Sequence, residues 1–469
     1  MVPEKFRRQL RQEAEHWWSE GLIDAALYEK LAERYQLNAL EQEASNRFVA
    51  ILTGLGAILL GIGAITFVAA NWQEWPRSLK LLLLLGSLLA VNGVGFYLWR
   101  RPLSQKGYQR LGHGLLLLGA LLLGANLALM SQMFHQSGSV YELYLVWSFG
   151  VLAMAYGLRL TSLGVVSLIL LGVGYLLGWF DGLSGVLSSN LKGVIQHMPL
   201  LVSLGFIPLA YWCRSRVIFG LSAVWIATSL SFNLRPFSFW GVGNGWIVAI
   251  AFILPVALLW SYSNRLWQRP GTPNDRKNPT YGFTAIAQSL ALICLSIVLY
   301  LLSFRWQWQF PPRDTSFPAL GATLIDALIL AVFAIIHWVG LLHPRSLRQA
   351  LTQAVNSVTV AIALLLLGGV LVVHIDQSPI PIVSIFLVNL LLFLLAIALI
   401  RDGLALGARR TFWGGMVLLV LAIVTRVLEY NTGLLFKSLV ISLCGVGILA
   451  AGVWFERAIR PHHTSSLPE

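Results

Sequence analysis

Long hydrophobic runs alternate with short polar segments along almost the whole chain. Runs such as LLLLLGSLLAVNGVGFYLW continue for about 20 residues without a charge, the length that an α-helix needs to cross the bilayer core at about 1.5 Å per residue. A membrane β-barrel would instead show segments of about ten residues in which polar and apolar positions alternate. The pattern therefore predicts an all-α fold, a polytopic transmembrane helical bundle.

About fourteen runs have this character. We expect membrane spans at about residues 48–70, 79–99, 111–133, 141–158, 161–180, 197–213, 217–234, 240–263, 282–303, 318–341, 351–374, 378–400, 411–428 and 434–455. The chain then divides into an N-terminal segment (1–47), four spans (48–158), about ten further spans (159–455) and a polar tail (456–469).

Composition agrees with this prediction and excludes a soluble protein. Of the 469 residues, 57% are hydrophobic and 11% are charged, whereas roughly 25% are charged in an ordinary soluble domain. The formal charge of +13 would suit a nucleic-acid-binding protein, but the basic residues are dispersed among the loops and gather on no single segment. The expected partner is therefore the lipid bilayer, and nucleic acid is excluded.

The basic residues predict an orientation, because short cytoplasmic loops of membrane proteins carry an excess of Lys and Arg. With fourteen spans and a cytoplasmic N-terminus, 25 of the 33 Lys and Arg residues fall inside and 8 outside. Tryptophans at both sets of span ends match the aromatic belts of membrane proteins. We expect both termini in the cytoplasm.

The segment 1–47 is predicted to be a short cytoplasmic helical hairpin. Phe6, Leu10, Ala14 and Trp17 recur at helical spacing on one face, and Asp24 can cap a second amphipathic helix. The two apolar faces either pack on each other or dock on the membrane surface or on a protein partner.

Four segments in the first third of the chain resemble a bacterial family. They are WWSEGLIDAALYEKLAERY, FVAANWQEWP, LMSQMFHQSGS and YLVWSFGVLAMAYGLRLTSL. They are similar to the predicted membrane proteins grouped under domain of unknown function 2157, over roughly residues 8–165. The resemblance implies a bacterial inner-membrane protein, and it brings no activity, cofactor or catalytic residue with it.

Glycines repeat the spacing G-x-G-x4-G in the first and third expected spans, at Gly54, Gly56, Gly61 and at Gly112, Gly114, Gly119. Small residues let helices approach closely, and Ala120 with Gly124 extends this pattern in the third span. The spacing predicts close helix pairing, and a duplicated two-span unit is an alternative explanation of the repeat.

Asp326 is the only acid well inside an expected span. Because an aspartate at mid-membrane costs roughly 2.5 to 3.5 kcal/mol on insertion scales, it should face the bundle interior, be protonated or have a partner. His337 lies eleven residues later on the same helix face. The amides Asn356, Gln288 and Asn389 on other spans are candidate partners. This intramembrane polar site is either a proton or substrate site or a structural polar clamp.

The other polar groups are weaker candidates for a functional site. His135 lies in a short outer loop with Gln132 and Glu142, a candidate polar cluster that lacks a second strong metal ligand, and a solvated loop is the simpler interpretation. Arg426 and Glu429 have the spacing of a structural ion pair. The chain has no phosphate loop, HExxH, CxxC or GxSxG motif. We therefore expect no enzyme activity, no cofactor and no bound metal.

Two functions of different classes remain. A transporter or lipid-handling, flippase-like protein predicts a polar cavity near mid-membrane lined by Asp326. A non-transporting scaffold or regulator predicts a tightly packed bundle and a hairpin with an exposed apolar face that recruits a protein partner. Transport is favoured because fourteen spans with a buried acid exceed the needs of an anchor. The small-molecule substrate is not predicted.

Overall fold

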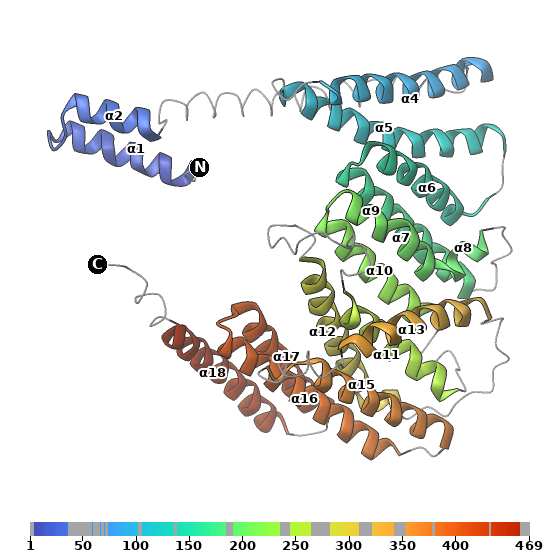
Figure 1. Ribbon diagram of the computed structural model, residues 1–469, viewed down its shortest axis with the longest axis vertical. Helices are drawn as coiled ribbons and strands as arrows, with labels where there is room; N and C mark the ends of the chain where they lie inside the picture. Colours follow the sequence, from blue (N-terminus) through green and yellow to red (C-terminus); the bar gives the residue numbers. More distant parts are fainter. Residues whose placement is uncertain are drawn as a thin grey trace. The chain divides into compact units, whose positions relative to one another are not determined.

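The structure is a computed structural model, and every regular element in it is helical (Figure 1). It describes residues 4–35, 59, 66, 70, 74–101, 106–135, 138–183, 191–234, 244–263, 282–308, 321–341, 353–377, 380–430 and 433–459. The chain divides into two compact units, residues 1–89 and 90–469, and each is considered by itself. The span expected at 48–70, with Gly54, Gly56 and Gly61, lies outside the described residues apart from three isolated positions.

The first unit contains a helical hairpin made of α1 (Glu4–Ser19) and α2 (Ala25–Tyr35). Ala14 and Ala32 are buried between the two helices, and the Trp18 and Tyr28 rings stack with centroids 5.3 Å apart. The Asp24 carboxylate accepts a hydrogen bond from the backbone N–H of Leu27, 2.9 Å away, as expected of a helix cap. The apolar faces of α1 and α2 therefore pack on each other, which is the self-packing alternative.

Thirteen apolar helices account for most of the described chain. They are α4 (Arg77–Trp99), α5 (Lys106–Met133), α6 (Val140–Leu158), α7 (Thr161–Leu183), α9 (Met198–Trp212), α10 (Arg216–Leu234), α11 (Gly245–Ser261), α12 (Gly282–Leu302), α13 (Gly321–Leu341), α15 (Ser357–Val372), α16 (Pro381–Ala405), α17 (Arg409–Glu429) and α18 (Leu434–Ile459). Short elements join some of them, namely α8 (Lys192–Gln196), η5 (Arg305–Trp308) and η6 (Val373–Gln377).

These helices confirm the predicted transmembrane helical class. Within the described residues, eleven helices are long and apolar enough to cross a membrane, and α9 and α11 are shorter apolar helices. Each of the thirteen coincides with an expected span, so a total of about fourteen is plausible when the span at 48–70 is counted. α9 and α11 each contain an internal proline, Pro208 and Pro255.

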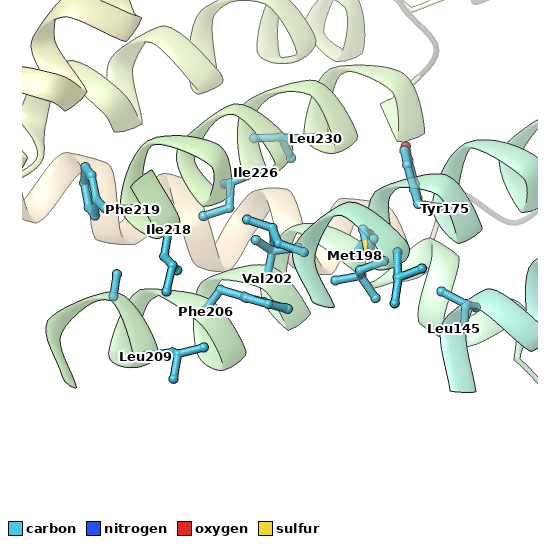
Figure 2. Packing of buried hydrophobic residues seen from close by; sticks show 14 of the residues in the cluster. Leu145, Tyr175, Met198, Val202, Phe206, Leu209, Ile218, Phe219, Ile226 and Leu230 are labelled. Carbon is cyan, nitrogen blue, oxygen red and sulfur yellow. The ribbon is translucent and has the colours of Figure 1, made fainter. Parts of the chain in front are cut away.

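α7, α10 and α11 contribute much of the protein interior in the second unit. In its most hydrophobic stretch, α7 is 61% buried and α10 is 56% buried. The other helices long enough to span a membrane are at most a third buried. α7 packs on α6 and α9, whereas α10 packs on α9, α11 and α12. Figure 2 shows Val202 and Phe206 of α9 meeting Ile218 and Ile226 of α10 in this core. A second cluster joins α10, α11, α12, α15 and α16.

The glycine pattern of α5 is used at two different interfaces. A Cβ added at Gly112 would lie 2.4 Å from the backbone nitrogen of Trp99, so α4 and α5 approach here at backbone distance. Gly114 meets nothing within 4 Å. Trp147 of α6 covers Gly124, and its indole N–H donates to the Ala120 carbonyl over 2.7 Å. The prediction of close helix pairing is thus confirmed at Gly112 and Gly124.

The predicted ion pair of α17 is present. The Arg426 guanidinium contacts the Glu429 carboxylate and also donates a 2.6 Å hydrogen bond to the carbonyl of Ser303 at the end of α12. Its charge lies 4.4 Å from the centre of the Phe304 ring. The pair therefore joins α17 to α12, besides the α16–α17 packing.

Candidate functional site

Asp326 is fully buried near the beginning of α13. Its Oδ1 atom lies 2.7 Å from Nδ1 of His197, and the two side chains form an acid–imidazole pair. Its Oδ2 atom is buried and has no hydrogen-bond partner among the described residues. Because an unsatisfied buried acceptor costs about 1 to 3 kcal/mol, this carboxylate oxygen is an expensive feature of the bundle.

His197 immediately precedes α9 as its N-cap residue, one position before Met198 and two before Pro199. The His197 side chain is 41% exposed, whereas that of Asp326 is 1% exposed. The pair therefore connects a position inside the bundle to its surface. The carboxylate also lies at the positive end of the α9 dipole, which favours a negative charge.

The amides expected to bond Asp326 have other positions. Asn356 caps the start of α15, where its side chain accepts hydrogen bonds from the N–H groups of Val358 and Thr359. Asn389 donates to the carbonyls of Ser303 and Ile385. Gln288 is half-buried on α12, and no bond joins it to Asp326 among the described residues. The partner of Asp326 is His197, because the residue that precedes α9 lies beside the second turn of α13.

His337 lies toward the other end of α13 and does not contact Asp326. Its Nδ1 atom is 3.5 Å from the Ser263 hydroxyl, just beyond the end of α11, and its ring packs against Phe333. The hydroxyl of Tyr262, the residue before Ser263, lies 2.5 Å from the hydroxyl of Tyr211 at the end of α9. The structure thus separates Asp326 and His337 into two polar groups.

An apolar cavity of about 360 Å³ lies between α9, α10, α11, α12 and α13. Its lining includes Leu330, four residues after Asp326 on α13, and Leu200, three residues after His197 on α9. Residues three or four apart share a helix face. The Asp326–His197 pair therefore lies one helical turn from the cavity, and Tyr262 lines it near the opposite end of α13.

The cavity has a buried floor and an exposed rim. Phe219, Ala223 and Ala287 of the floor are almost fully buried. Leu204 of α9 and Ile336 of α13 line the same cavity, yet they are 73% and 66% exposed. Leu204 lies midway along the apolar helix α9, and Ile336 lies in α13, which is long enough to span a membrane, so a bilayer around these helices would bring acyl chains to the rim. The cavity therefore opens sideways into lipid between α9 and α13.

This cavity differs from the expected one. The transport hypothesis predicted a polar cavity lined by Asp326, but this cavity is lined almost wholly by apolar side chains, and Asp326 is not among them. Ser203 and Tyr262 are its hydroxyl-bearing residues. The physical reason is that His197 already occupies the accessible side of the carboxylate.

The outer-loop cluster is not assembled. Gln132 and His135 are exposed at the end of α5, and Glu142 is half-buried in the first turn of α6. No hydrogen bond joins these three residues in the described part of the chain. Within that part, no three His, Cys, Asp or Glu side chains gather in a way that could hold a metal ion.

Sequence reasoning missed two acids that tie helix ends together, the buried Asp402 and the exposed Asp376. Asp402, near the end of α16, accepts 2.8 Å hydrogen bonds from the backbone N–H groups of Ala354 and Val355. Asp376 accepts a 2.6 Å bond from the N–H of Gly245 at the start of α11. Both follow a hydrophobic run directly, and this position next to a span end is the one signal that could have indicated them.

The fold and this lateral cavity define an α-helical multi-pass membrane protein. The family described as "Predicted membrane protein (DUF2157)" matches residues 15–164, and this confirms the resemblance expected from the first third of the chain. The match ends early in α7, so the Asp326–His197 pair and the cavity lie beyond it. No curated protein and no solved structure matches the chain.

Proposed function

We propose that this protein is a lipid-handling transporter, which takes an amphipathic lipid from the bilayer into the cavity between α9 and α13. The observation that carries the proposal is the lateral opening, because a cavity with an exposed apolar rim in the membrane is continuous with the acyl chains. Its volume lies within the range of about 300 to 1,000 Å³ that is typical of ligand pockets. A hydrophilic substrate would find almost no hydrogen-bonding partner there.

The Asp326–His197 pair supports a transporter in which the spacing between α9 and α13 can change. It connects the second turn of α13 to the residue that precedes α9, and these two helices border the opening. Because His197 is partly exposed, this bond can exchange with water without exposing the buried core. In the proposed transporter the pair acts as a latch that sets the spacing of α9 and α13.

We also propose where the protein lies in the cell. The family resemblance favours a bacterial inner-membrane protein, and the distribution of Lys and Arg favours both termini in the cytoplasm. We propose no enzymatic step, no cofactor and no nucleic-acid partner.

A reconstitution experiment tests the proposal with two matched serine variants. Ser203 lines the cavity and donates a 2.7 Å bond to the Pro199 carbonyl, whereas Ser289 is exposed on α12 and donates a 2.8 Å bond to the Ala285 carbonyl. Both serines thus bond the carbonyl four residues earlier, and only Ser203 faces the cavity. Ser203→Trp fills the cavity and Ser289→Trp adds the same side chain to the outer surface.

The probes are fluorescently labelled phosphatidylglycerol and phosphatidylcholine in proteoliposomes, with a membrane-impermeant quencher that reports movement between leaflets. The wild type and Ser289→Trp should raise the movement of at least one probe about tenfold over protein-free liposomes, and Ser203→Trp should abolish this increase. Equal rates in the two variants, or no rate above protein-free liposomes, would refute the proposal.

A second function has one supporting observation. Trp18, Leu22 and Leu27 of the hairpin expose 51%, 68% and 46% of their surfaces, more than a self-contained helix pair requires. A scaffold that recruits a protein partner through this hairpin would lose crosslinking to that partner in Leu22→Glu. If the protein is instead a lipid transporter, Leu22→Glu should move each probe at the same rate as the wild type.

A further inference from the structure

The polar groups near the two ends of the cavity have different chemistry. The end toward the start of α13 has the Asp326 carboxylate, which repels an anion. The end toward the close of α11 has the paired hydroxyls of Tyr211 and Tyr262, and hydroxyls can donate to an anion. A ligand that lies along the cavity therefore has an acid one helical turn beyond one end and hydroxyl donors at the other.

Arg216 extends the donor end. It is the first residue of α10, three positions before Phe219, which lines the cavity. Its side chain packs over the start of α12, where a Cβ added at Gly282 would lie 2.7 Å from the Arg216 Nε atom. The next residue, Phe283, stacks on Phe219 with ring centroids 4.6 Å apart. Arg216 is thus one helical turn from the cavity, and it is exposed.

Two more exposed arginines, Arg159 and Arg214, lie near the end of α9. Arg159 follows α6 and lies 4.8 Å from the centre of the Trp212 ring, at the end of α9. Arg214 begins the turn into α10, and both arginines have positive φ angles, 54° and 50°. The Tyr156 hydroxyl donates a 2.6 Å bond to the Gly205 carbonyl and so fixes α6 against α9.

These three guanidinium groups have no acidic partner among the described residues. Arg159 lies against the exposed Trp212, and Arg214 and Arg216 follow Trp212 in the turn from α9 into α10. Tryptophan is typical of the headgroup level of a bilayer, where basic side chains attract anionic lipids. Arginine also offers two parallel N–H donors to a phosphate, which lysine does not.

We propose that the lipid taken by the cavity has an anionic phosphate headgroup, which Arg216 binds together with Arg214 and Arg159 while an acyl chain occupies the cavity. This inference rests on the proposed function and adds the substrate class to it. The ligand is an anionic phospholipid of the surrounding bilayer, and the end with Asp326 receives the apolar terminus of the chain.

Native mass spectrometry of the full-length protein with equal amounts of phosphatidylglycerol and phosphatidylcholine tests this inference. The wild type should retain phosphatidylglycerol about tenfold more than phosphatidylcholine. Arg216→Gln should remove most of this preference, and Arg216→Lys should restore only part of it, because lysine keeps the charge without the paired donors. The lysine variant and its melting temperature separate a binding effect from misfolding.

Arg100→Gln is the matched control. Arg100 is an exposed arginine at the end of α4, 5.2 Å from the centre of the Phe96 ring, and it resembles Arg159 in its aromatic contact. Arg100→Gln removes the same charge and should leave the preference unchanged. An equal loss in Arg100→Gln and Arg216→Gln would overturn the inference in favour of diffuse surface charge.

The remaining outcomes separate the two proposals. If the wild type retains both lipids equally and Ser203→Trp releases both, the cavity binds lipid and the headgroup inference is wrong. If Ser203→Trp releases neither lipid, the proposed function itself fails. Displacement of phosphatidylglycerol by millimolar inorganic phosphate would show that the arginines bind free phosphate without a chain, and it would also overturn the inference.

Discussion

The unequal exposure of Asp326 and His197 gives their pair an asymmetric role. If the acid is removed, the partly exposed imidazole can bond to water. If the imidazole is removed, a carboxylate that is 1% exposed keeps only the backbone N–H of Leu200 as a described partner. Breaking one side of a buried pair is costly because it leaves an uncompensated polar group, whereas replacing both sides with apolar groups can be nearly neutral.

This asymmetry predicts a specific order of stabilities. His197→Phe should lower the melting temperature clearly, by the equivalent of about 1 to 3 kcal/mol, and Asp326→Leu should lower it much less. The double variant His197→Phe/Asp326→Leu should be more stable than His197→Phe alone. Thermal unfolding of the four proteins in lipid nanodiscs, followed by tryptophan fluorescence, measures the order. Simple addition of the two single losses would contradict the argument.

At the residue scale, the sequence predicted the cost of Asp326 but not its partner. An isolated acid in a span is visible in any sequence, since few other residues there are charged. His197 is 129 positions away and sits at a span end, where a histidine has many ordinary explanations. The pairing depends on which helices are neighbours, and hydrophobic runs contain no information on that.

Helices α4 and α5 approach closely at Gly112, whereas Gly114, two positions later, packs against nothing within 4 Å. Gly112 faces the backbone of Trp99, and Gly114 faces open space on the same helix. An α-helix turns by 100° per residue, so positions two apart point in different directions. The G-x-G spacing therefore contains one glycine that packs and one that does not.

Alanine substitutions at these two glycines should have opposite effects. Gly112→Ala forces the helices apart and should destabilise the protein by about 1 to 3 kcal/mol, as expected of overpacking. Gly114→Ala should be neutral or stabilise by up to about 1 kcal/mol, because alanine favours the helical backbone. Melting temperatures in a common detergent provide the measurement, and equal losses at both positions would show that α4 and α5 do not meet as described.

The elements themselves were the most predictable level of the structure. Thirteen helices coincide with expected spans because the cost of an unpaired backbone group in lipid forces each long apolar run to be helical. The short elements α8, η5 and η6 were not expected. They contain mixed polar and apolar residues, and their conformation depends on packing rather than on hydrophobicity.

For the whole molecule, an even number of spans places both termini on one side of the membrane. Single cysteines introduced in a variant with Cys213, Cys294 and Cys444 replaced by serine can test this arrangement. An impermeant maleimide should label Trp306→Cys in intact spheroplasts, whereas Glu29→Cys and Arg100→Cys should react only after permeabilisation. Trp306, Glu29 and Arg100 are all exposed, so burial would not explain a lack of reaction at the introduced cysteines. Labelling of Glu29→Cys in intact spheroplasts would place the N-terminus outside and contradict the expected orientation.

The lateral opening of the cavity also bears on how the protein must be handled. The proposed lipid site exchanges with the surrounding amphiphile and would never be empty, because solubilisation replaces lipid tails with surfactant tails at very high local concentration. Surfactant then competes for the site, and the apparent affinity for any lipid will follow its mole fraction in the micelle rather than its bulk concentration. Surfactants with short linear tails should therefore hide lipid selectivity, and rigid sterol-based ones, which fit the opening poorly, should preserve it.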